Sequence, residues 1–399
     1  MESYLLDWAN LLVRWLHVIA AIAWIGESIY FVMLDNSLHA PKDEAKKQLG
    51  MFGEMWAVHG GGFYNNQKYL TNPPELPDNL HWSFWKSYTT WLTGFAMFAL
   101  LYLFNASFYL VNPDSSWAWV AGMSGMQASL VALAFLAGGW ILYDQLCRRI
   151  SPNMDHDGAL SIAVALMMVA VAWLAAMIFP GRAAFLITGA VMATSMSANV
   201  FFWIIPGQRR MVSDLKAGRQ PNPLDGKRGK QRSVHNTYFT LPVVFLMISN
   251  HYAFTYSSTL SWLVMVCFIF SGALIRQYFV LRHSGRNLLA LPAAGVLILA
   301  FAAWLIAPQA AVPGNAATAT SFQEARRIID NRCVACHAAQ PQQPGFTVAP
   351  LGILLDSERD ILLNAVRIKQ TVSANIMPLG NLTGMTAEER QRIELWNGK

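Results

Sequence analysis

Long apolar stretches separated by short polar ones occupy the first three quarters of the chain. Each stretch is close to the length of about 20 residues that an α-helix needs to cross a bilayer. The stretches lie at roughly residues 9–33, 91–111, 121–143, 160–179, 184–205, 237–256, 260–280 and 288–307. The pattern predicts a bundle of eight transmembrane helices, of which the first and sixth are the least purely apolar.

The pattern changes after Pro308. Residues 309–320 carry no charge and consist mainly of Ala, Thr, Gly and Pro, which is typical of a flexible linker. Residues 321–399 have ordinary charge, with helices expected at 322–332 and 386–396; the second begins at Thr386 as N-cap with Glu389 three residues later. We therefore expect an all-α protein with a membrane domain (1–308), a linker (309–320) and a small C-terminal domain (321–399).

Composition excludes a soluble single domain, since the chain is 54% hydrophobic and only 13% charged, against about 25% charged residues in an average protein. The loops expected on one side of the membrane carry 18 of the 29 basic residues, whereas the opposite loops carry only Arg182. By the positive-inside rule, both termini then lie outside. No cleavable signal is evident, and the first span is expected to act as its own insertion signal. No basic patch with interleaved aromatic residues suggests nucleic acid as a partner.

Cys333, Cys336 and His337 form the Cys-x-x-Cys-His pattern of covalent c-type haem attachment. Two thiols about one helical turn apart can each add to a haem vinyl group, and the adjacent His337 then lies beneath the iron as the proximal ligand. Met377 is the expected distal ligand, with Met385 as its competitor, and His/Met ligation suits an electron acceptor because it raises the reduction potential. The pattern predicts one covalent haem c with His337 and Met377 as axial iron ligands.

Two other sites use a Cys-x-x-Cys pair. A zinc site would need four ligands, whereas this domain offers two cysteines and one histidine. A thioredoxin-like redox pair would follow a strand, whereas residues 322–332 look helical. The outer location predicted for the domain independently favours haem c, because that group is attached beyond the cytoplasmic membrane.

Polar residues within apolar spans are costly and are therefore functional candidates. Arg14 and His17 share one face of the first span, with His17 roughly 15 Å along the helix, near mid-membrane. A histidine there could bind haem iron, relay protons or hydrogen-bond a neighbouring helix. His235 and His251 bracket the sixth span about 24 Å apart and cannot ligate one iron.

The first long loop contains His59, Gly60, Gly61 and Gly62, followed by the His81–Trp82 pair. Glycines let the backbone approach a ligand closely, and histidine with aromatic rings can bind a flat heterocycle. From spacing alone, an amphipathic helix with an aromatic belt at the membrane interface is the favoured interpretation. Cys147 and Cys267 are interpreted as isolated small hydrophobes.

Several of these runs together resemble the bacterial membrane-bound urate oxidases (urate hydroxylases, PuuD type). The matching runs are residues 14–20 with 24–26, residues 58–64, the pair 81–82, residues 235–238 and residues 241–251. In that family an eight-span domain is fused to a periplasmic cytochrome c domain. The resemblance implies oxidation of urate to 5-hydroxyisourate in purine catabolism. It also implies a multi-pass protein of the bacterial inner membrane with both termini in the periplasm, which passes electrons through haem c to a respiratory acceptor, a cytochrome c or a terminal oxidase.

A urate site would use a guanidinium for bidentate contact, an aromatic ring for stacking and a histidine as proton acceptor. Arg14 or Arg182 is the candidate clamp, and His17 or His59 the candidate base. If urate bound at the inner loop, electrons would cross about 30 Å of hydrocarbon, which suggests a second, b-type haem near His17. The alternative function is a quinol-linked, membrane-anchored electron carrier with no substrate chemistry of its own.

Overall fold

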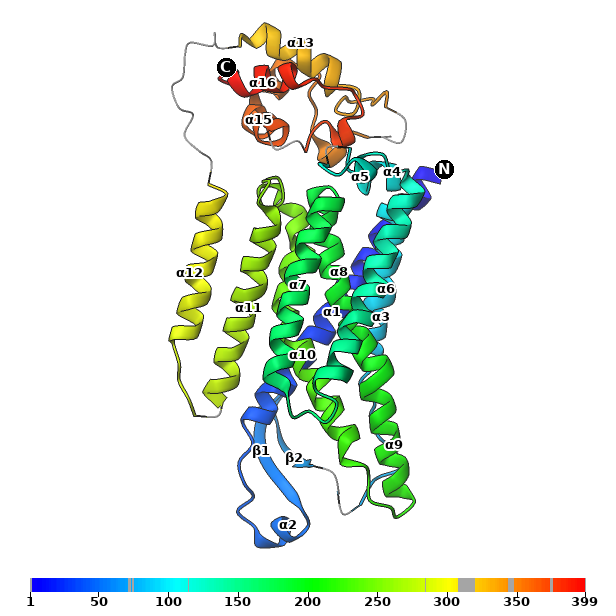
Figure 1. Ribbon diagram of the computed structural model, residues 1–399, viewed down its shortest axis with the longest axis vertical. Coiled ribbons are helices and arrows are strands. Elements are labelled where there is room, and N and C mark those ends of the chain that lie inside the picture. Colours follow the sequence, from blue (N-terminus) through cyan, green and yellow to red (C-terminus); the bar gives the residue numbers. More distant parts are fainter. Residues whose placement is uncertain are drawn as a thin grey trace.

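The computed structural model describes residues 2–70, 73, 75–113, 115–283, 285–307, 320–343, 348–373 and 376–398. Long helices form an elongated bundle with a β-hairpin at one end and a group of short helices at the other (Figure 1). The all-α prediction is confirmed apart from this hairpin. Of the predicted linker, only Thr320 lies within the described residues.

Each of the eight predicted apolar segments overlaps one long helix. These helices are α1 (Glu2–Asn36), α3 (Trp85–Phe98), α6 (Gly125–Ile150), α7 (Asp157–Ile178), α8 (Gly181–Ala198), α10 (Pro223–Ile248), α11 (Ser261–His283) and α12 (Ala290–Leu305). Within the described ranges, five segments are long and apolar enough to cross a membrane: Trp8–Asn36, Gly125–Ile150, Asp157–Ile178, Gly181–Lys216 and Ser261–Arg282. These five segments indicate a membrane protein. Helix α12 is apolar but shorter, and the first half of α10 is polar.

Two helices continue through π-helical segments. Helix α3 runs into η1 (Ala99–Leu103), which leads to the short helices α4 (Ala106–Tyr109) and α5 (Ala118–Ala121); helix α8 runs through η2 (Asn199–Ile204) into α9 (Ile205–Lys216). Such π-helical turns are frequent at functional sites. Here they carry Tyr102 and Asn199, whose polar groups take part in the two clusters described below.

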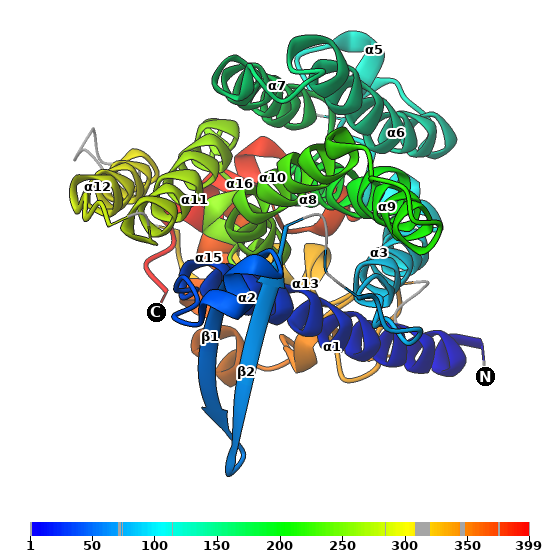
Figure 2. The same ribbon diagram turned by 90° about the horizontal axis from the view of Figure 1, so that it is seen from below.

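The first long loop folds differently from the amphipathic helix favoured by its spacing, and that prediction is wrong. It forms α2 (Glu44–Gln48) and an antiparallel hairpin of β1 (Met51–His59) and β2 (Gly62–Tyr69). In the turn, Gly60 and Gly61 have φ of +57° and +81°. Two left-handed residues in succession match the twist of the strands, and glycine adopts this conformation without strain. The hairpin projects away from the helices (Figure 2).

Helix α10 begins well before the predicted start of the sixth span and includes basic residues expected in a loop. One of them, Arg232, is 3% exposed, and its Nη2 donates to Asp144 Oδ1 at 2.9 Å. Trp203 Nε1 donates to the same oxygen at 2.7 Å, and Arg148 Nε lies 2.7 Å from the other carboxylate oxygen. Pairing with a buried carboxylate therefore explains why Arg232 lies inside the bundle rather than in a solvated loop.

Replacing Asp144 by alanine is expected to lower the free energy of unfolding by about 3–5 kcal/mol, because it leaves the Arg232 guanidinium buried and unpaired. The measurement is the unfolding midpoint of the purified protein in detergent. The control is Asp144→Leu combined with Arg232→Leu, which removes both charges and should regain much of the loss. A single variant as stable as the parent would contradict the structural role of the pair.

The described residues from Thr320 onwards form helices around a separate core. These helices are α13 (Phe322–Arg332), α14 (Glu358–Leu363), α15 (Ala365–Ser373) and α16 (Ala387–Leu395). The predictions of α13 and α16 are confirmed, and Thr386 and Glu389 form the expected reciprocal cap of α16. Fully buried Ile329, Ile361 and Trp396 fill this core. The group sits over α4 and α5, at the end of the bundle opposite the hairpin (Figure 1).

Candidate functional site

An apolar cavity opens in the C-terminal group of helices beside the Cys-x-x-Cys-His run. It encloses a volume of about 150 Å³ and is partly open to solvent. Cys333, Cys336, His337 and Met377 line it, together with mainly aliphatic side chains. Cofactor sites in proteins are typically lined by apolar side chains together with a few fixed polar groups. The lining of this cavity therefore matches the chemistry of a flat, largely apolar group such as a porphyrin.

The imidazole of His337 is oriented for ligation. Its Nδ1 lies 3.0 Å from the carbonyl oxygen of Ile353. Since a carbonyl only accepts, Nδ1 carries the hydrogen, and the lone pair is left on Nε2. Metal-binding histidines are commonly fixed in this way through their second ring nitrogen. Within the described part of the chain, no three His, Cys, Asp or Glu side chains lie close enough together to hold a metal ion.

The two thiols do not resemble a catalytic redox pair. Cys333 and Cys336 are free cysteines. Burial, with a smaller effect of the neighbouring Cys336, raises the pKa of Cys333 to about 12, and burial also raises the pKa of Cys336. Thioredoxin-like centres instead lower the pKa of their nucleophilic cysteine. The burial of the thiols and the helix that precedes them therefore both disfavour the thioredoxin-like alternative.

The two candidate distal methionines lie in different surroundings. Met377 lines the cavity, whereas Met385 is 3% exposed and belongs to the apolar core. Arg390 Nη1 donates to the carbonyl oxygen of Met377 at 2.8 Å and thereby holds the loop that carries it. The geometry favours Met377 as the thioether that faces a group in the cavity.

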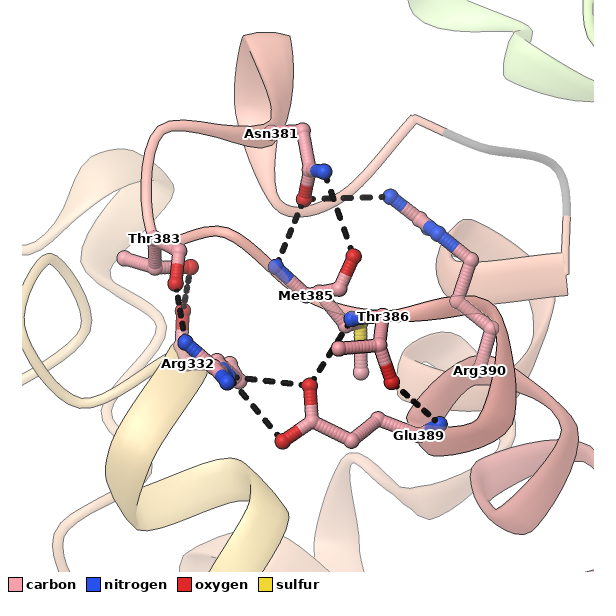
Figure 3. Close-up of polar contacts among 7 residues, drawn as sticks. All are labelled: Arg332, Asn381, Thr383, Met385, Thr386, Glu389 and Arg390. Atoms are coloured by element: carbon pink, nitrogen blue, oxygen red, sulfur yellow. Dashed lines mark hydrogen bonds and ion pairs between the residues drawn. The ribbon is translucent and has the colours of Figure 1, made fainter.

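A hydrogen-bonded cluster (Figure 3) includes Arg332 and Thr383, which line the cavity. Arg332, which precedes Cys333, donates from Nε to both carboxylate oxygens of Glu389 at 3.1 and 3.0 Å. Its Nη1 donates to the carbonyl of Thr383, whose hydroxyl donates to the carbonyl of Arg332 at 2.8 Å. These bonds fix the start of the Cys-x-x-Cys-His run to α16 and to the loop that follows Met377.

Acidification is expected to loosen this cluster. Burial raises the pKa of Glu389, but the Thr386 N–H and the Arg332 and Arg327 guanidinium groups together outweigh it, so the net pKa is lowered. A carboxyl with a lowered folded-state pKa stabilises above its unfolded value and loses that contribution as pH falls through the folded value. We expect the free energy of unfolding to fall by at most about 1 kcal/mol, starting below roughly pH 4. Hydrogen exchange of α13 and α16 amides should show it, and Glu389→Gln should be less stable at neutral pH and lack this acid-dependent loss.

One residue lining the cavity comes from the bundle. Phe108 of α4 lines it together with Cys336 and His337. Helix α4 also packs against η6 (Leu379–Asn381) of the C-terminal group. The bundle thus contributes directly to the wall of the cavity, a role that the sequence pattern did not indicate for Phe108.

Beside α4 lies a polar cluster, the outer cluster, formed by Arg182, Asn250, Tyr102 and Tyr109. Arg182 Nε donates to Asn250 Oδ1 at 3.1 Å, and the Tyr102 hydroxyl donates to the same oxygen at 3.4 Å. The Arg182 guanidinium carbon lies 5.9 Å from the centre of the Tyr109 ring. A guanidinium, an amide and aromatic rings are the groups expected to bind a planar anion. The structure therefore places one predicted clamp, Arg182, near the C-terminal group of helices.

His17 packs against α3. Its Nδ1 lies 3.0 Å from the Thr90 carbonyl oxygen and 3.0 Å from Thr93 Oγ1. A Cβ added at Gly94 would come within 2.9 Å of His17 Cε1, so glycine permits this close approach. Of the three roles left open for His17, a hydrogen bond to a neighbouring helix is the one that the geometry displays.

The structure does not bring the other predicted catalytic residues together. Arg14 is exposed and donates from Nη2 to Asn10 Oδ1 at 3.2 Å, within its own helix. His59 is exposed in the hairpin, at the turn that projects away from the bundle (Figure 2). A joint site of Arg14, His17 and His59 is therefore not formed.

A second polar cluster, the inner cluster, surrounds His235 in the half of the bundle nearer the hairpin. His235 Nδ1 lies 2.8 Å from the Tyr143 hydroxyl. Asn199 Nδ2 donates to that hydroxyl at 3.0 Å and to Asn236 Oδ1 at 2.9 Å. These groups satisfy one another, as in a structural buried network. Tyr143 and Asn199 were not expected from the sequence; the signal that could have found Asn199 is a lone amide in an apolar span.

Comparison with known proteins identifies the bundle. No curated protein and no solved structure matches the chain. The family described as urate oxidase N-terminal matches residues 3–307, the stretch that contains α1 to α12 and ends before the C-terminal group of helices. Because the match covers most of the chain, the chain belongs to the urate oxidase N-terminal family.

Proposed function

We propose that the protein is a membrane-bound oxidoreductase, of the PuuD type, that oxidises urate to 5-hydroxyisourate and passes the electrons to haem c in its C-terminal domain. Family membership points to a urate enzyme of the oxidoreductase type. The observation that carries the proposal is the contact of this family's bundle, through Phe108, with an apolar cavity lined by a Cys-x-x-Cys-His run.

The residues of the cavity fit the group. Cys333 and Cys336 would form the covalent bonds to it, while His337 Nε2 and the Met377 thioether would face the iron. Urate and water give 5-hydroxyisourate, two electrons and two protons. When bound, haem c supplies a one-electron acceptor of raised potential, so two successive transfers to a cytochrome c or terminal oxidase balance one turnover.

The outer cluster is the proposed urate site. Arg182 is the only basic residue expected in the loops of its side, where the positive-inside rule disfavours one, and binding an anion accounts for it. A site there spares the electrons the crossing of about 30 Å of hydrocarbon that an inner site would demand. A second haem at His17 is not part of the proposal, because a urate site at the outer cluster removes the long crossing that suggested it.

The proposed topology has eight spans in the inner membrane of a bacterium, with both termini in the periplasm. The start of α1 and the C-terminal domain lie at one end of the bundle, and the hairpin lies at the other (Figure 1). The 18 basic residues counted for the inner side fall in segments towards the hairpin end. Protease accessibility of a C-terminal tag in intact spheroplasts would test this orientation.

The proposal is tested by adding urate without oxygen to the oxidised, purified protein. We expect the absorbance bands of reduced haem c to appear, together with 5-hydroxyisourate. Absence of reduction by urate, with rapid reduction by a quinol, would instead establish the membrane-anchored electron carrier. Haem absorbance that responds to neither, in protein that ascorbate reduces, would exclude both functions.

Replacing His59 by alanine is expected to leave urate turnover close to that of the parent, because the hairpin turn lies away from the outer cluster. Steady-state kcat/KM with haem content held equal is the measurement. A fall in kcat/KM of more than about tenfold, equivalent to ~1.4 kcal/mol in the activation barrier, would show that the hairpin is part of the active site.

A further inference from the structure

A column of aromatic rings follows α3 and η1 towards the end of the bundle that lies next to the C-terminal group of helices. Phe98 and Tyr102 are stacked with ring centres 5.8 Å apart, and both are about 5% exposed or less. Tyr102 and Tyr109 lie 5.2 Å apart, and Tyr109 and Phe108 lie 4.9 Å apart. Consecutive rings are therefore in contact from the interior of the bundle to α4.

Three members of this column contact the two proposed sites. Tyr102 donates to Asn250 of the outer cluster, and Arg182 lies over the ring of Tyr109. Phe108 lines the cavity of Cys333, His337 and Met377. Three rings thus join the proposed urate site to the wall of the proposed haem site.

We propose that Tyr102, Tyr109 and Phe108 form the electron path from the bundle to haem c, and that Phe108 also closes the edge of the haem cavity towards the membrane. This inference rests on the proposed function and adds the residues that connect its two sites. One electron at a time would leave the bound purine, pass through the rings and reduce a ferric haem in the cavity. The two protons released per turnover do not use this path.

The rings act as a tunnelling medium and are not themselves oxidised. A c-type haem is too mild an oxidant to remove an electron from a phenol, and Phe108 has no hydroxyl to lose a proton. Closely packed π-systems nevertheless couple donor and acceptor better than aliphatic side chains of similar size. Removing a ring should therefore slow transfer more than removing a tyrosine hydroxyl.

The test uses the full-length protein, loaded with haem, in anaerobic rapid-mixing experiments. Tyr109→Leu and Phe108→Leu are each expected to slow urate-driven reduction by about tenfold, and Tyr109→Phe to be faster than Tyr109→Leu. Ascorbate, a small reductant that reaches the haem from solvent, should reduce all variants at least as fast as the parent. Phe104→Leu is the matched control, since Phe104 precedes α4 but is 78% exposed.

A second readout needs no turnover. Phe108→Ser should lower the haem midpoint potential, because water admitted at the cavity edge stabilises the ferric charge, whereas Phe104→Leu should leave it unchanged. Unaltered urate-driven rates in both leucine variants would overturn the electron path, as would a Tyr109→Phe variant as slow as Tyr109→Leu. An unaltered potential in Phe108→Ser would overturn the closing role. Failure of the proposed function can be told apart from failure of the electron path, because urate would then not reduce the haem of the parent protein either.

Discussion

Replacing both Cys333 and Cys336 by alanine is expected to abolish covalent haem attachment and, with it, all urate-driven reduction. The two thiols are the only cysteines that line the cavity, and a c-type haem is held through thioether bonds to such a pair. Haem staining after denaturing electrophoresis measures the covalent bond directly, and the pyridine haemochrome spectrum reports the number of vinyl groups that have reacted. Each single variant should retain one bond and show a shifted spectrum.

The chain supplies its own control for this experiment. Cys147 and Cys267 are also free and buried, but they lie in α6 and α11 of the bundle. Replacing both by alanine should leave haem staining intact. Covalent haem that persists in the Cys333→Ala, Cys336→Ala variant would show that the C-terminal cavity serves another ligand, and the electron acceptor of the urate reaction would then have to be sought elsewhere.

The features predictable from the sequence were those that depend on neighbours along the chain. Apolar stretches located eight helices, although only five segments of the described residues are long and apolar enough to cross a membrane. The spacing of residues 333–337 predicted a haem c site. Helices α13 and α16 were predicted correctly because their caps and apolar faces are local. The hairpin was missed, although the Gly60–Gly61 pair is a recognised turn signal.

What could not be predicted depends on partners far apart in sequence. The burial of Arg232 within α10 depends on Asp144, 88 residues away. The outer cluster depends on Arg182 meeting Asn250 across 68 residues. Spacing along one helix suggested Arg14 with His17 instead, because periodicity shows which residues share a face but not which helix that face meets.

Replacing Arg182 by glutamine is expected to lower kcat/KM for urate roughly 10- to 150-fold, the equivalent of about 1.5–3 kcal/mol for a lost charge-assisted hydrogen bond. Arg182→Lys should recover only part of the loss, because an ammonium keeps the charge but not the planar pair of donors that matches a planar anion. The comparison variant is Arg14→Gln, which removes the other predicted clamp; Arg14 bonds Asn10 on its own helix, so this variant should impair urate oxidation much less than Arg182→Gln. Steady-state rates are divided by the concentration of haem that ascorbate can reduce. This separates a loss of urate binding from a loss of bound haem. If Arg14→Gln rather than Arg182→Gln impairs urate oxidation, the substrate lies on the α1 face of the bundle, and the short path through Tyr109 and Phe108 loses its starting point.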